Sequence, residues 1–526
     1  MQDKRSAPPD PSPGFPIRVG VVDMGSNAIR FVIADFIAGS TWTPLVSERI
    51  PVRLAGHVFE SGFLSDEAIE VAVGVMERFR DVLTQHDVRH YRAVATSAVR
   101  ESGNRRSLVR QVRERTGLRL EVISGAEEAR LVYWAARSRV PLEGEPWLLA
   151  DLGGGSLEIA IVDGDEIRSI ESLAIGTVRL LEEFESETGG PDRIRRLLDD
   201  YVSGLRFDSF EEDLAVGGYV ASGGNIDDLA RVAGVSPDER GVSVLSVKDL
   251  KKAINTLAGM TVEERIEEYE LRENRADVIV PAGMVYARLA ERFGVSRIHV
   301  PNVGVKEGAM LDLVDDLTAS KGHGQRRARE VQAGAVALGR RFRFEEAHGL
   351  HVARLSESLF DALADIHDLD GKDREILVAA AILHDVGQRI SYKRHHKHSY
   401  YLISESELPG LDLDEVELVA NVARYHRRAD PSSKHPPFDA LDEEDQKRVR
   451  RLSAILRVAD SLDREHVQNV RDIAVEISDE HMEIELEGEG TFELERWALE
   501  RKKGLFVKTF GLEIIVANEA VKNESI

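Results

Sequence analysis

Two hydrophobic spacings alternate along the first part of the chain. Strand-like apolar runs occupy residues 18–23, 28–36, 91–95, 119–123 and 147–163. The spacing of amphipathic helices occupies residues 66–86, 105–117 and 126–139. A further strand-like run at residues 298–302 precedes a helix that begins near Glu307. Because strands and helices alternate in two successive halves, we predict an α/β architecture here.

The pattern changes near Ser320. Residues 321–327 form a polar stretch with glycines, and residues 329–466 have helical spacing. Strand-like runs return at residues 474–477, 482–486 and 512–516, with a helical segment before the last. We therefore predict a disordered tail (1–16), two α/β subdomains (17–130 and 131–318), a helical domain (319–468) and a small α+β module (469–526).

Composition limits the class of protein. Of 526 residues, 42% are hydrophobic and 31% are charged, which is typical of a soluble globular protein. No apolar run reaches the roughly 18 residues of a membrane span, so we expect no membrane partner. The absence of cysteine excludes thiolate chemistry and fits a cytoplasmic protein. The net charge of −24 argues against nucleic-acid binding, so a polyanionic substrate needs local basic residues or metal ions.

One turn occurs twice. An apolar run ends in Asp23-Met24-Gly25-Ser26-Asn27, and another ends in Asp151-Leu152-Gly153-Gly154-Gly155-Ser156. The apolar positions that follow stay in register, with Ile29 matching Leu157, Phe31 matching Ile159 and Ile33 matching Ile161. Each turn places a carboxylate beside exposed N–H groups, which suits a phosphate with a bound divalent cation. Two ordinary hairpins are the alternative, but the in-register repeat favours a phosphate cleft between two halves.

The two turns supply the candidate metal ligands and the candidate hydrogen-bond donors to phosphate in this cleft. We predict that Asp23 and Asp151 hold Mg²⁺, a cation that prefers oxygen ligands. The N–H and hydroxyl groups for phosphate come from Gly25, Ser26, Asn27, Gly153, Gly154, Gly155 and Ser156.

Three further segments join the two turns in a set of motifs. The first is Ala-Thr-Ser-Ala-Val-Arg, which ends at Arg100, and the second is Ile-Ser-Gly-Ala-Glu-Glu-Ala-Arg-Leu, which contains Glu128. The third is another glycine turn, at Gly223 and Gly224. In order and spacing over residues 17–317, the set resembles the exopolyphosphatase / guanosine pentaphosphate phosphatase (Ppx/GppA) family of the actin–Hsp70–sugar-kinase superfamily. The third turn has Asn225 where the family usually has Thr, and residues 303–308 also depart from the family pattern. These departures affect the choice of substrate more than the hydrolytic chemistry.

The resemblance implies a duplicated ribonuclease-H-like fold and Mg²⁺-dependent release of a terminal phosphate. It assigns Glu128 as the general base on water, while Glu127 is a solvated or helix-N-terminal acid. Arg100 holds a phosphate, with a surface ion pair as the alternative, and Glu158 points into the cleft. The remaining phosphate-binding positions are Thr96, Ser97, Gly223 and Gly224.

The helical domain carries a second set of candidate ligands. His348, the pair His384-Asp385, and Asp460 follow one another in the order typical of the HD phosphohydrolase superfamily, which this domain resembles. Imidazole and carboxylate together suit Mn, Fe, Co or Zn. The extra imidazoles that could complete a second metal position belong to His395, His396, His398 and His426. The alternative is that these side chains are packing groups of a domain that has lost its metal.

A basic cluster is interleaved with these histidines. It consists of Arg389, Lys393, Arg394, Lys397, Arg424, Arg427 and Arg428. In so acidic a protein this concentration indicates a track for a long polyanion, and a solvated helix surface is the alternative.

Inorganic polyphosphate is therefore the leading substrate hypothesis, with hydrolysis of its terminal phosphate in the cleft. The alternatives are hydrolysis of the 5′-phosphate of pppGpp and a nucleotide-sensing regulatory protein with little turnover, which would bind guanosine penta- or tetraphosphate. The presence of Asp23, Glu128 and Asp151 counts against the regulatory alternative. The family resemblance also implies a homodimer.

Overall fold

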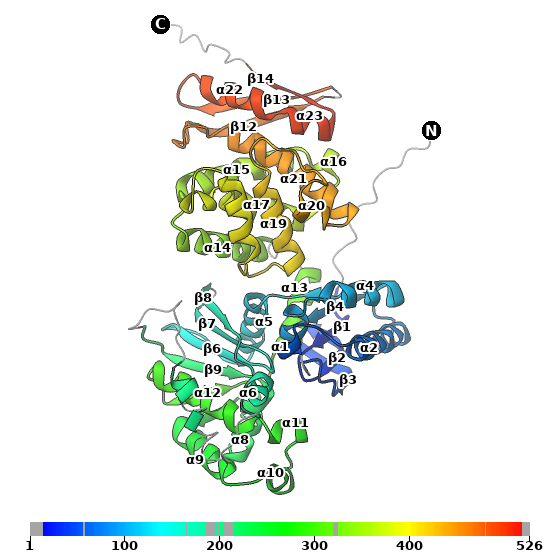
Figure 1. The fold of residues 1–526 in the computed structure, drawn as a ribbon, viewed down its shortest axis with the longest axis vertical. Coiled ribbons are helices and arrows are strands. Elements are labelled where there is room, and N and C mark those ends of the chain that lie inside the picture. Colours follow the sequence, from blue (N-terminus) through cyan, green and yellow to red (C-terminus); the bar gives the residue numbers. More distant parts are fainter. Residues whose placement is uncertain are drawn as a thin grey trace. The chain divides into compact units, whose positions relative to one another are not determined.

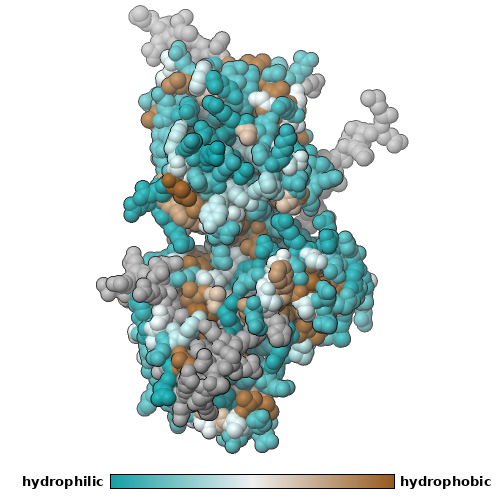
Figure 2. Space-filling view, in the orientation of Figure 1, coloured by the Kyte–Doolittle hydropathy of each residue, from teal (hydrophilic) through white to brown (hydrophobic). Residues whose placement is uncertain are grey.

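The computed structural model describes residues 14–55, 58–164, 166–185, 196–197, 200–204, 214–318, 324–478 and 480–517. The chain divides into two compact units, residues 1–323 and 324–526 (Figure 1). Most of the predicted tail and residues 321–323 of the predicted linker lie outside the described residues. None of the described helices is long and apolar enough to cross a membrane. The face drawn in Figure 2 is predominantly hydrophilic.

A five-stranded sheet forms the first half of unit 1, in the order β3-β2-β1-β4-β5. Its strands are β1 (Ile17–Met24), β2 (Ile29–Ala38), β3 (Thr41–Ile50), β4 (His90–Ala95) and β5 (Glu121–Val122). β1, β2 and β3 are antiparallel neighbours, whereas β4 and β5 continue the sheet in parallel with β1. The helices are α1 (Val58–Ser61), α2 (Asp66–Gln85), α3 (Ser97–Arg100), α4 (Arg105–Thr116) and α5 (Gly125–Arg137).

The second half repeats this sheet. Its order is β8-β7-β6-β9-β11-β10, from β6 (Trp147–Leu152), β7 (Leu157–Asp163), β8 (Glu166–Leu173), β9 (Gly218–Ser222), β10 (Ser243–Ser246) and β11 (Arg297–Val300). β8, β7 and β6 are antiparallel, β9 and β11 are parallel to β6, and β10 is an additional edge strand. The helices are α6 (Thr177–Glu185), α8 (Gly224–Val232), α9 (Val247–Ala258), α10 (Val262–Tyr269), α11 (Glu273–Ala276), α12 (Ile279–Arg292) and α13 (Val305–Thr318). The predicted duplication of α/β halves is confirmed.

Helices α5 and α13 join the two sheets through one shared core. Val21 of β1 and Leu149 of β6 belong to the same cluster of buried residues as Leu131 of α5 and Met310 of α13. α5 is buried on almost its whole circumference, so even its charged residues are enclosed. This is why α5 can hold acidic side chains in a fixed position between the two halves.

Unit 2 is a helical layer with a small sheet packed on it. Its helices are α14 (Gly324–Arg341), α15 (Glu346–Ala362), α16 (Ala364–His367), α17 (Gly371–Leu383), α18 (His395–Ser404), α19 (Leu413–Arg424), α20 (Pro436–Asp439) and α21 (Glu443–Ser461), with a 3₁₀ turn at Val386–Arg389. The sheet contains β12 (Val470–Ile477), β13 (His481–Gly488) and β14 (Glu513–Val516), together with α22 (Glu493–Lys502) and α23 (Gly504–Phe510). The buried residues of both layers form one core, although the sequence pattern separates them at residue 469.

Candidate active site

The two repeated turns are β-hairpins with the same backbone geometry. In β1–β2 the Gly25 N–H donates to the Ala28 carbonyl (3.1 Å), and in β6–β7 the Gly153 N–H donates to the Ser156 carbonyl (2.9 Å). The residue paired with the aspartate differs, because Asp23 lies opposite Arg30 whereas Asp151 lies opposite Glu158. The two halves therefore present the same turn with different charge beside it.

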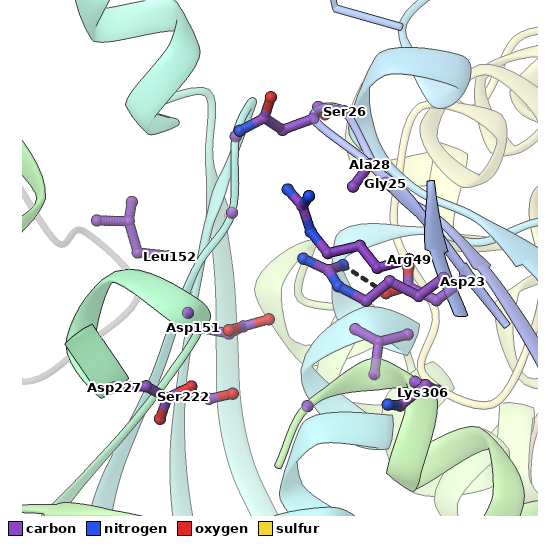
Figure 3. Close-up of a pocket in the computed structure, with 18 of the residues that line it drawn as sticks. Asp23, Gly25, Ser26, Ala28, Arg49, Asp151, Leu152, Ser222, Asp227 and Lys306 are labelled. Carbon is purple, nitrogen blue, oxygen red and sulfur yellow. Dashed lines mark hydrogen bonds and ion pairs between the residues drawn. The ribbon is translucent and has the colours of Figure 1, made fainter. Parts of the chain in front are cut away.

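A cavity of about 820 Å³ lies between the halves of unit 1. Figure 3 shows Asp23 and Asp151 approaching it from different sheets. The predicted site residues that line it are Asp23, Gly25, Ser26, Asn27, Thr96, Ser97, Glu128, Asp151, Gly153, Gly154, Gly223 and Gly224. Arg100, Gly155, Ser156 and Glu158 are not part of its lining.

Close approach of the turns requires glycine. The hydroxyls of Ser26 and Ser97 are hydrogen-bonded at 2.8 Å, which joins the first turn to α3. A Cβ on Gly154 would lie 3.0 Å from the Ser26 Cβ, and one on Gly155 would lie 2.6 Å from the Ser97 hydroxyl. The second turn thus packs directly on the first, and larger residues would force the halves apart.

Three buried carboxylates meet beside this contact. One oxygen each of Glu128, Asp151 and Glu158 lie within 4.8 Å of one another. Burial raises the pKa of Glu128 to about 7, although Arg100 opposes the shift, and Asp151 adds to it. Burial likewise raises the pKa of Asp151 to about 6, and burial followed by the charge of Glu128 raises that of Glu158. The Glu158 Oε2 atom is buried without a hydrogen-bond partner among the described residues.

This donor set fits a divalent cation, since three oxygens that repel one another would each be stabilised by it. Asp23 is not a member of the trio, and its Oδ2 is 2.9 Å from Arg30 Nη1. That Asp23 and Asp151 together hold Mg²⁺ stays a prediction.

Arg100 lies behind Glu128. Its Nη1 donates to Glu128 Oε2 (3.0 Å) and to the Ile123 carbonyl (3.1 Å), and its Nη2 donates to the Ser156 hydroxyl (3.2 Å). Glu158 Oε1 is 3.5 Å from the same Nη2. The guanidinium thus positions the Glu128 carboxylate, and its predicted contact with phosphate stays a prediction.

Glu127 has a structural position. It is buried and pairs with Arg130 at 2.6 Å and with Arg92 at 3.0 Å. Its N–H is also capped by the Ser124 side chain, which fixes the start of α5. The interpretation of Glu127 as a helix-N-terminal acid agrees with this placement.

Five arginines also line the cavity: Arg30, Arg49, Arg231, Arg272 and Arg275. Arg30 and Arg49 are cross-strand partners in β2 and β3, an arrangement that is unfavourable for like charges. Burial, followed by the charges of Arg30, Arg272 and Arg275, lowers the pKa of Arg49 to about 10. Its Nε and Nη2 atoms are buried without hydrogen-bond partners in the described part of the chain (Figure 3).

No sequence motif predicts these arginines, but the internal repeat contains one indication of them. In the repeat, Arg30 occupies the position of Glu158, so the internal alignment already placed a cation beside the cleft. The third turn makes room for another, because a Cβ on Gly224 would lie 2.2 Å from Arg275 Nη2. A cavity that is lined both by mutually repelling arginines and by the carboxylates of Glu128 and Asp151 is suited to bind a polyanion together with a cation.

The predicted ligands of unit 2 also converge. His348 Nε2 and His384 Nε2 are 3.2 Å apart, and Asp460 Oδ1 is 3.9 Å and 3.7 Å from them. These three side chains form one possible metal-binding group.

A second group adjoins the first. His395 Nε2 and His426 Nε2 are 3.1 Å apart, and they lie 3.0 Å and 3.4 Å from Asp385 Oδ1. Asp385 also approaches the first group, since its Oδ2 is 3.7 Å from His384 Nε2. Two possible metal positions are therefore adjacent. His396 and His398 belong to neither group in the described residues.

The hydrogen bonds of the imidazoles fix which nitrogen carries the proton. In each ring Nδ1 faces an oxygen: Asp463 Oδ2 for His348, and the carbonyls of Ala381, Tyr392 and Ala423 for His384, His395 and His426. Because these oxygens accept, each Nδ1 donates and each Nε2 presents a lone pair. Burial also lowers the pKa of His384 and His426, which favours their neutral form. Two pairs of Nε2 lone pairs at these short distances suit a cation between them.

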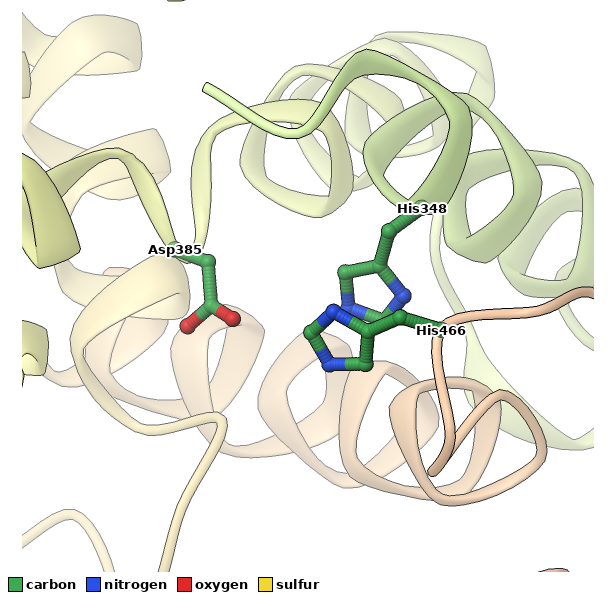
Figure 4. Close-up of side chains that lie close together, drawn as sticks. All are labelled: His348, Asp385 and His466. Atoms are coloured by element: carbon green, nitrogen blue, oxygen red, sulfur yellow. The ribbon is translucent and has the colours of Figure 1, made fainter. Parts of the chain in front are cut away.

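Two neighbours of this cluster were not predicted. His466 stacks on His348 with ring centroids 3.6 Å apart, and its Nδ1 is 2.7 Å from Glu345 Oε2 (Figure 4). Lys502, from α22, donates to Asp460 Oδ2. Asp385, His348 and His466 form a third possible ligand group. Neither neighbour has a sequence signal, because each reaches the cluster only through tertiary packing.

Comparison with known families identifies the class of this protein. The Ppx/GppA phosphatase family matches residues 32–317, and Ppx/GppA phosphatase, domain III, matches residues 329–503. The chain therefore belongs to the Ppx/GppA phosphatase family and is a hydrolase.

Individual relatives agree with this assignment. The exopolyphosphatase 1 of Mycobacterium leprae (strain TN) is 29% identical over 309 residues, which cover 57% of this chain and 90% of the relative. The solved structure of the Aquifex aeolicus Ppx/GppA family member matches with a TM-score of 0.51 and 26% identity, covering 58% of this chain and 99% of that one. An exopolyphosphatase from Cytophaga hutchinsonii matches with a TM-score of 0.51 and 27% identity, covering 57% and 98%.

Proposed function

We propose that the cavity of unit 1 hydrolyses the terminal phosphoanhydride bond of inorganic polyphosphate. The observation that carries the proposal is that Glu128 and Asp151, two members of the buried carboxylate trio, line the same cavity as five arginines. The trio suits the phosphate that is removed, and the arginines suit the phosphates that precede it. The names of the Mycobacterium leprae and Cytophaga hutchinsonii relatives support the same substrate.

In this mechanism Glu128 takes a proton from the attacking water. Its pKa of about 7 suits a general base near neutral pH, and Arg100 fixes one carboxylate oxygen while the other stays available. Asp151 and Glu158 would hold Mg²⁺, which would neutralise charge on the phosphate oxygens. Arg49 holds the chain, and Arg275 keeps the terminal phosphate in line with the water.

Release of phosphate from long-chain polyphosphate and from pppGpp tests this proposal. We expect Glu128→Gln to lower the rate by about 10²- to 10⁴-fold, the usual contribution of a general base. Glu114→Gln, at an exposed position of α4, is the matched control and should leave the rate unchanged. Equal rates for wild type and Glu128→Gln would refute the mechanism.

The same assay separates the substrates. Faster release from polyphosphate supports the proposal, whereas faster release from pppGpp favours the 5′-phosphohydrolase alternative. Binding of guanosine pentaphosphate with negligible release from either substrate would favour a nucleotide-sensing regulator.

We also propose that the histidine–aspartate cluster of unit 2 is an HD-type centre for two divalent ions. The paired Nε2 atoms at 3.2 Å and 3.1 Å carry this proposal. After loading with Mn²⁺ and gel filtration, wild-type protein should retain more Mn²⁺ than Asp385→Asn by elemental analysis. His481→Gln, outside the cluster, is the control. Equal retention by wild type and Asp385→Asn would contradict the centre.

A homodimer in the cytoplasm remains our proposal for the assembly and its location. Light scattering of the full chain distinguishes a dimer from a monomer, and fractionation of cells tests the location.

A further inference from the structure

One guanidinium bridges the β6–β7 turn and the first half of unit 1. It belongs to Arg179, in the first turn of α6, and its side chain is 20% exposed. The Arg179 Nε donates to the Gly155 carbonyl (3.1 Å), and its Nη2 is 2.5 Å from Glu101 Oε2. Its Cζ also lies 3.9 Å from the centre of the Phe59 ring. Arg179 belongs to the second half, whereas Glu101 and Phe59 belong to the first.

These contacts differ from those of an ordinary surface ion pair. An isolated exposed pair contributes little, because solvent screens it and both side chains lose conformational freedom. Here one planar guanidinium contacts a carbonyl, a carboxylate and the face of an aromatic ring, which fixes its orientation. The turn packs tightly beneath this ring, since a Cβ on Gly155 would lie 2.3 Å from Phe59 Cζ. The contacts therefore hold the turn in one position relative to the first half.

Helix α6 is also attached to the turn through its backbone. The Thr177 N–H donates to the Gly153 carbonyl (3.0 Å). The Val178 N–H donates to the Gly154 carbonyl (2.8 Å). The turn and the start of α6 are thus bonded to each other, and the Arg179 side chain connects both to a carboxylate of the first half.

Both ends of this bridge lead to the candidate general base. In the first half, Glu101 directly follows Arg100, whose guanidinium donates to Glu128 Oε2. In the second half, Gly155 directly precedes Ser156, whose hydroxyl accepts from Arg100 Nη2. The bridge therefore closes a ring of contacts around the Arg100 guanidinium. Displacement of the turn would remove one of the hydrogen bonds that hold this guanidinium behind Glu128.

We propose that Arg179 is a positioning residue for hydrolysis, which acts by holding the β6–β7 turn against the first half. The proposal rests on the function proposed above, because that function gives Glu128 its part in the reaction. Arg179 is not part of the lining of the cavity, so it acts through the turn rather than on the substrate. Its loss should therefore slow the chemical step and leave the binding of polyphosphate nearly unchanged.

A double-mutant cycle tests the bridge in the full chain. Phosphate release from long-chain polyphosphate gives kcat and KM for Arg179→Gln, Glu101→Gln and the double variant. We expect Arg179→Gln to lower kcat by about 10- to 100-fold, the effect of misplacing a catalytic group by about 1 Å, and to change KM by less than about threefold. Glu101→Gln should lower kcat less, because it removes only one of the contacts.

The double variant should be no slower than Arg179→Gln, because both substitutions break the same ion pair. Arg168→Gln is the matched control, since Arg168 pairs with Asp163 at an exposed site within the second half. An unchanged kcat for Arg179→Gln would overturn the proposal. Additive effects in the double variant, or an equal loss of activity in Arg168→Gln, would overturn it as well.

Amide hydrogen exchange provides a readout that needs no turnover. In Arg179→Gln the peptide of residues 152–158 should exchange faster than in wild type, whereas the peptide of β9, residues 218–222, should be unchanged. Equally faster exchange in both peptides would show a general loss of stability and overturn the positioning role. If the wild type releases no phosphate from polyphosphate, the function proposed above fails, and the exchange experiment still decides whether Arg179 holds the turn.

Discussion

Asp227 makes stability depend on pH in a way that can be measured. This carboxylate lies in the first turn of α8 and lines the cavity of unit 1 (Figure 3). Burial raises its pKa to about 7, Arg275 opposes the shift, and Asp228 and Asp151 add to it. In the unfolded chain an aspartate titrates near its ordinary value of about 3.9.

The direction in which stability changes with pH depends on which state, folded or unfolded, binds the Asp227 proton more tightly. Between pH 4 and 7 the folded state holds the Asp227 proton more tightly than the unfolded state, so the free energy of unfolding falls as pH rises through this window. A shift of about three units corresponds to about 4 kcal/mol at most, at about 1.4 kcal/mol for each unit. Asn cannot titrate. The stability of Asp227→Asn relative to wild type should therefore rise by about 2 to 4 kcal/mol between pH 4.5 and pH 8.

Urea unfolding followed by tryptophan fluorescence measures this difference. Three of the four tryptophans (Trp42, Trp134 and Trp147) are in unit 1, so the signal reports mainly on the unit that contains Asp227. Divalent ions and phosphate are omitted, since any ligand that binds only the folded state raises its stability. Asp81→Asn is the control, because Asp81 is an exposed aspartate of α2 in the same unit that does not line the cavity. A difference independent of pH, or one that decreases toward pH 8, would refute the reasoning.

Three further substitutions probe other contacts. Arg49→Ala should raise KM for polyphosphate by about 10- to 100-fold with little change in kcat, because a hydrogen bond to a charged group contributes about 1.5–3 kcal/mol. An unchanged KM in steady-state kinetics would contradict this prediction. Gly224→Ala places a Cβ 2.2 Å from Arg275 Nη2, so it should displace this guanidinium and lower kcat/KM by about tenfold. Full activity of the variant would show that hydrolysis does not need the guanidinium in this position. Arg92→Met should destabilise unit 1 by about 3–5 kcal/mol, since three carboxylates lose a buried partner, and a urea midpoint equal to that of wild type would exclude this.

The parts of the fold that the sequence predicts are those with local signals. The hairpins around Gly25 and Gly153 and the helix α5 have turn residues or a clear apolar period. β3 was missed because most of its side chains are exposed or half-buried, so its hydrophobic pattern is weak. β5 is shorter than predicted, because only Glu121 and Val122 pair with β4.

In the candidate active site, too, sequence motifs predict some residues and only the fold reveals the others. Glu128 and Asp151 could be predicted because each lies in a motif, and both line the cavity. Arg49 and Arg275 reach it from β3 and α11, and no spacing in the sequence relates them. Arg100 shows a second limit, because a guanidinium suits a phosphate and a carboxylate equally, and only the fold reveals that Glu128 is beside it.

The repeated hairpin has a consequence for the direction in which a polymer enters. Two halves with identical residues would make a cavity with equivalent ends, and a linear substrate would fit either way round. Arg30 and Glu158 occupy the same position of the two hairpins, but Arg30 lines the cavity whereas Glu158 lies outside its lining, which removes this equivalence. The duplicated turn therefore presents a cation to the substrate from one half of unit 1 only, and this gives the cavity a head and a tail.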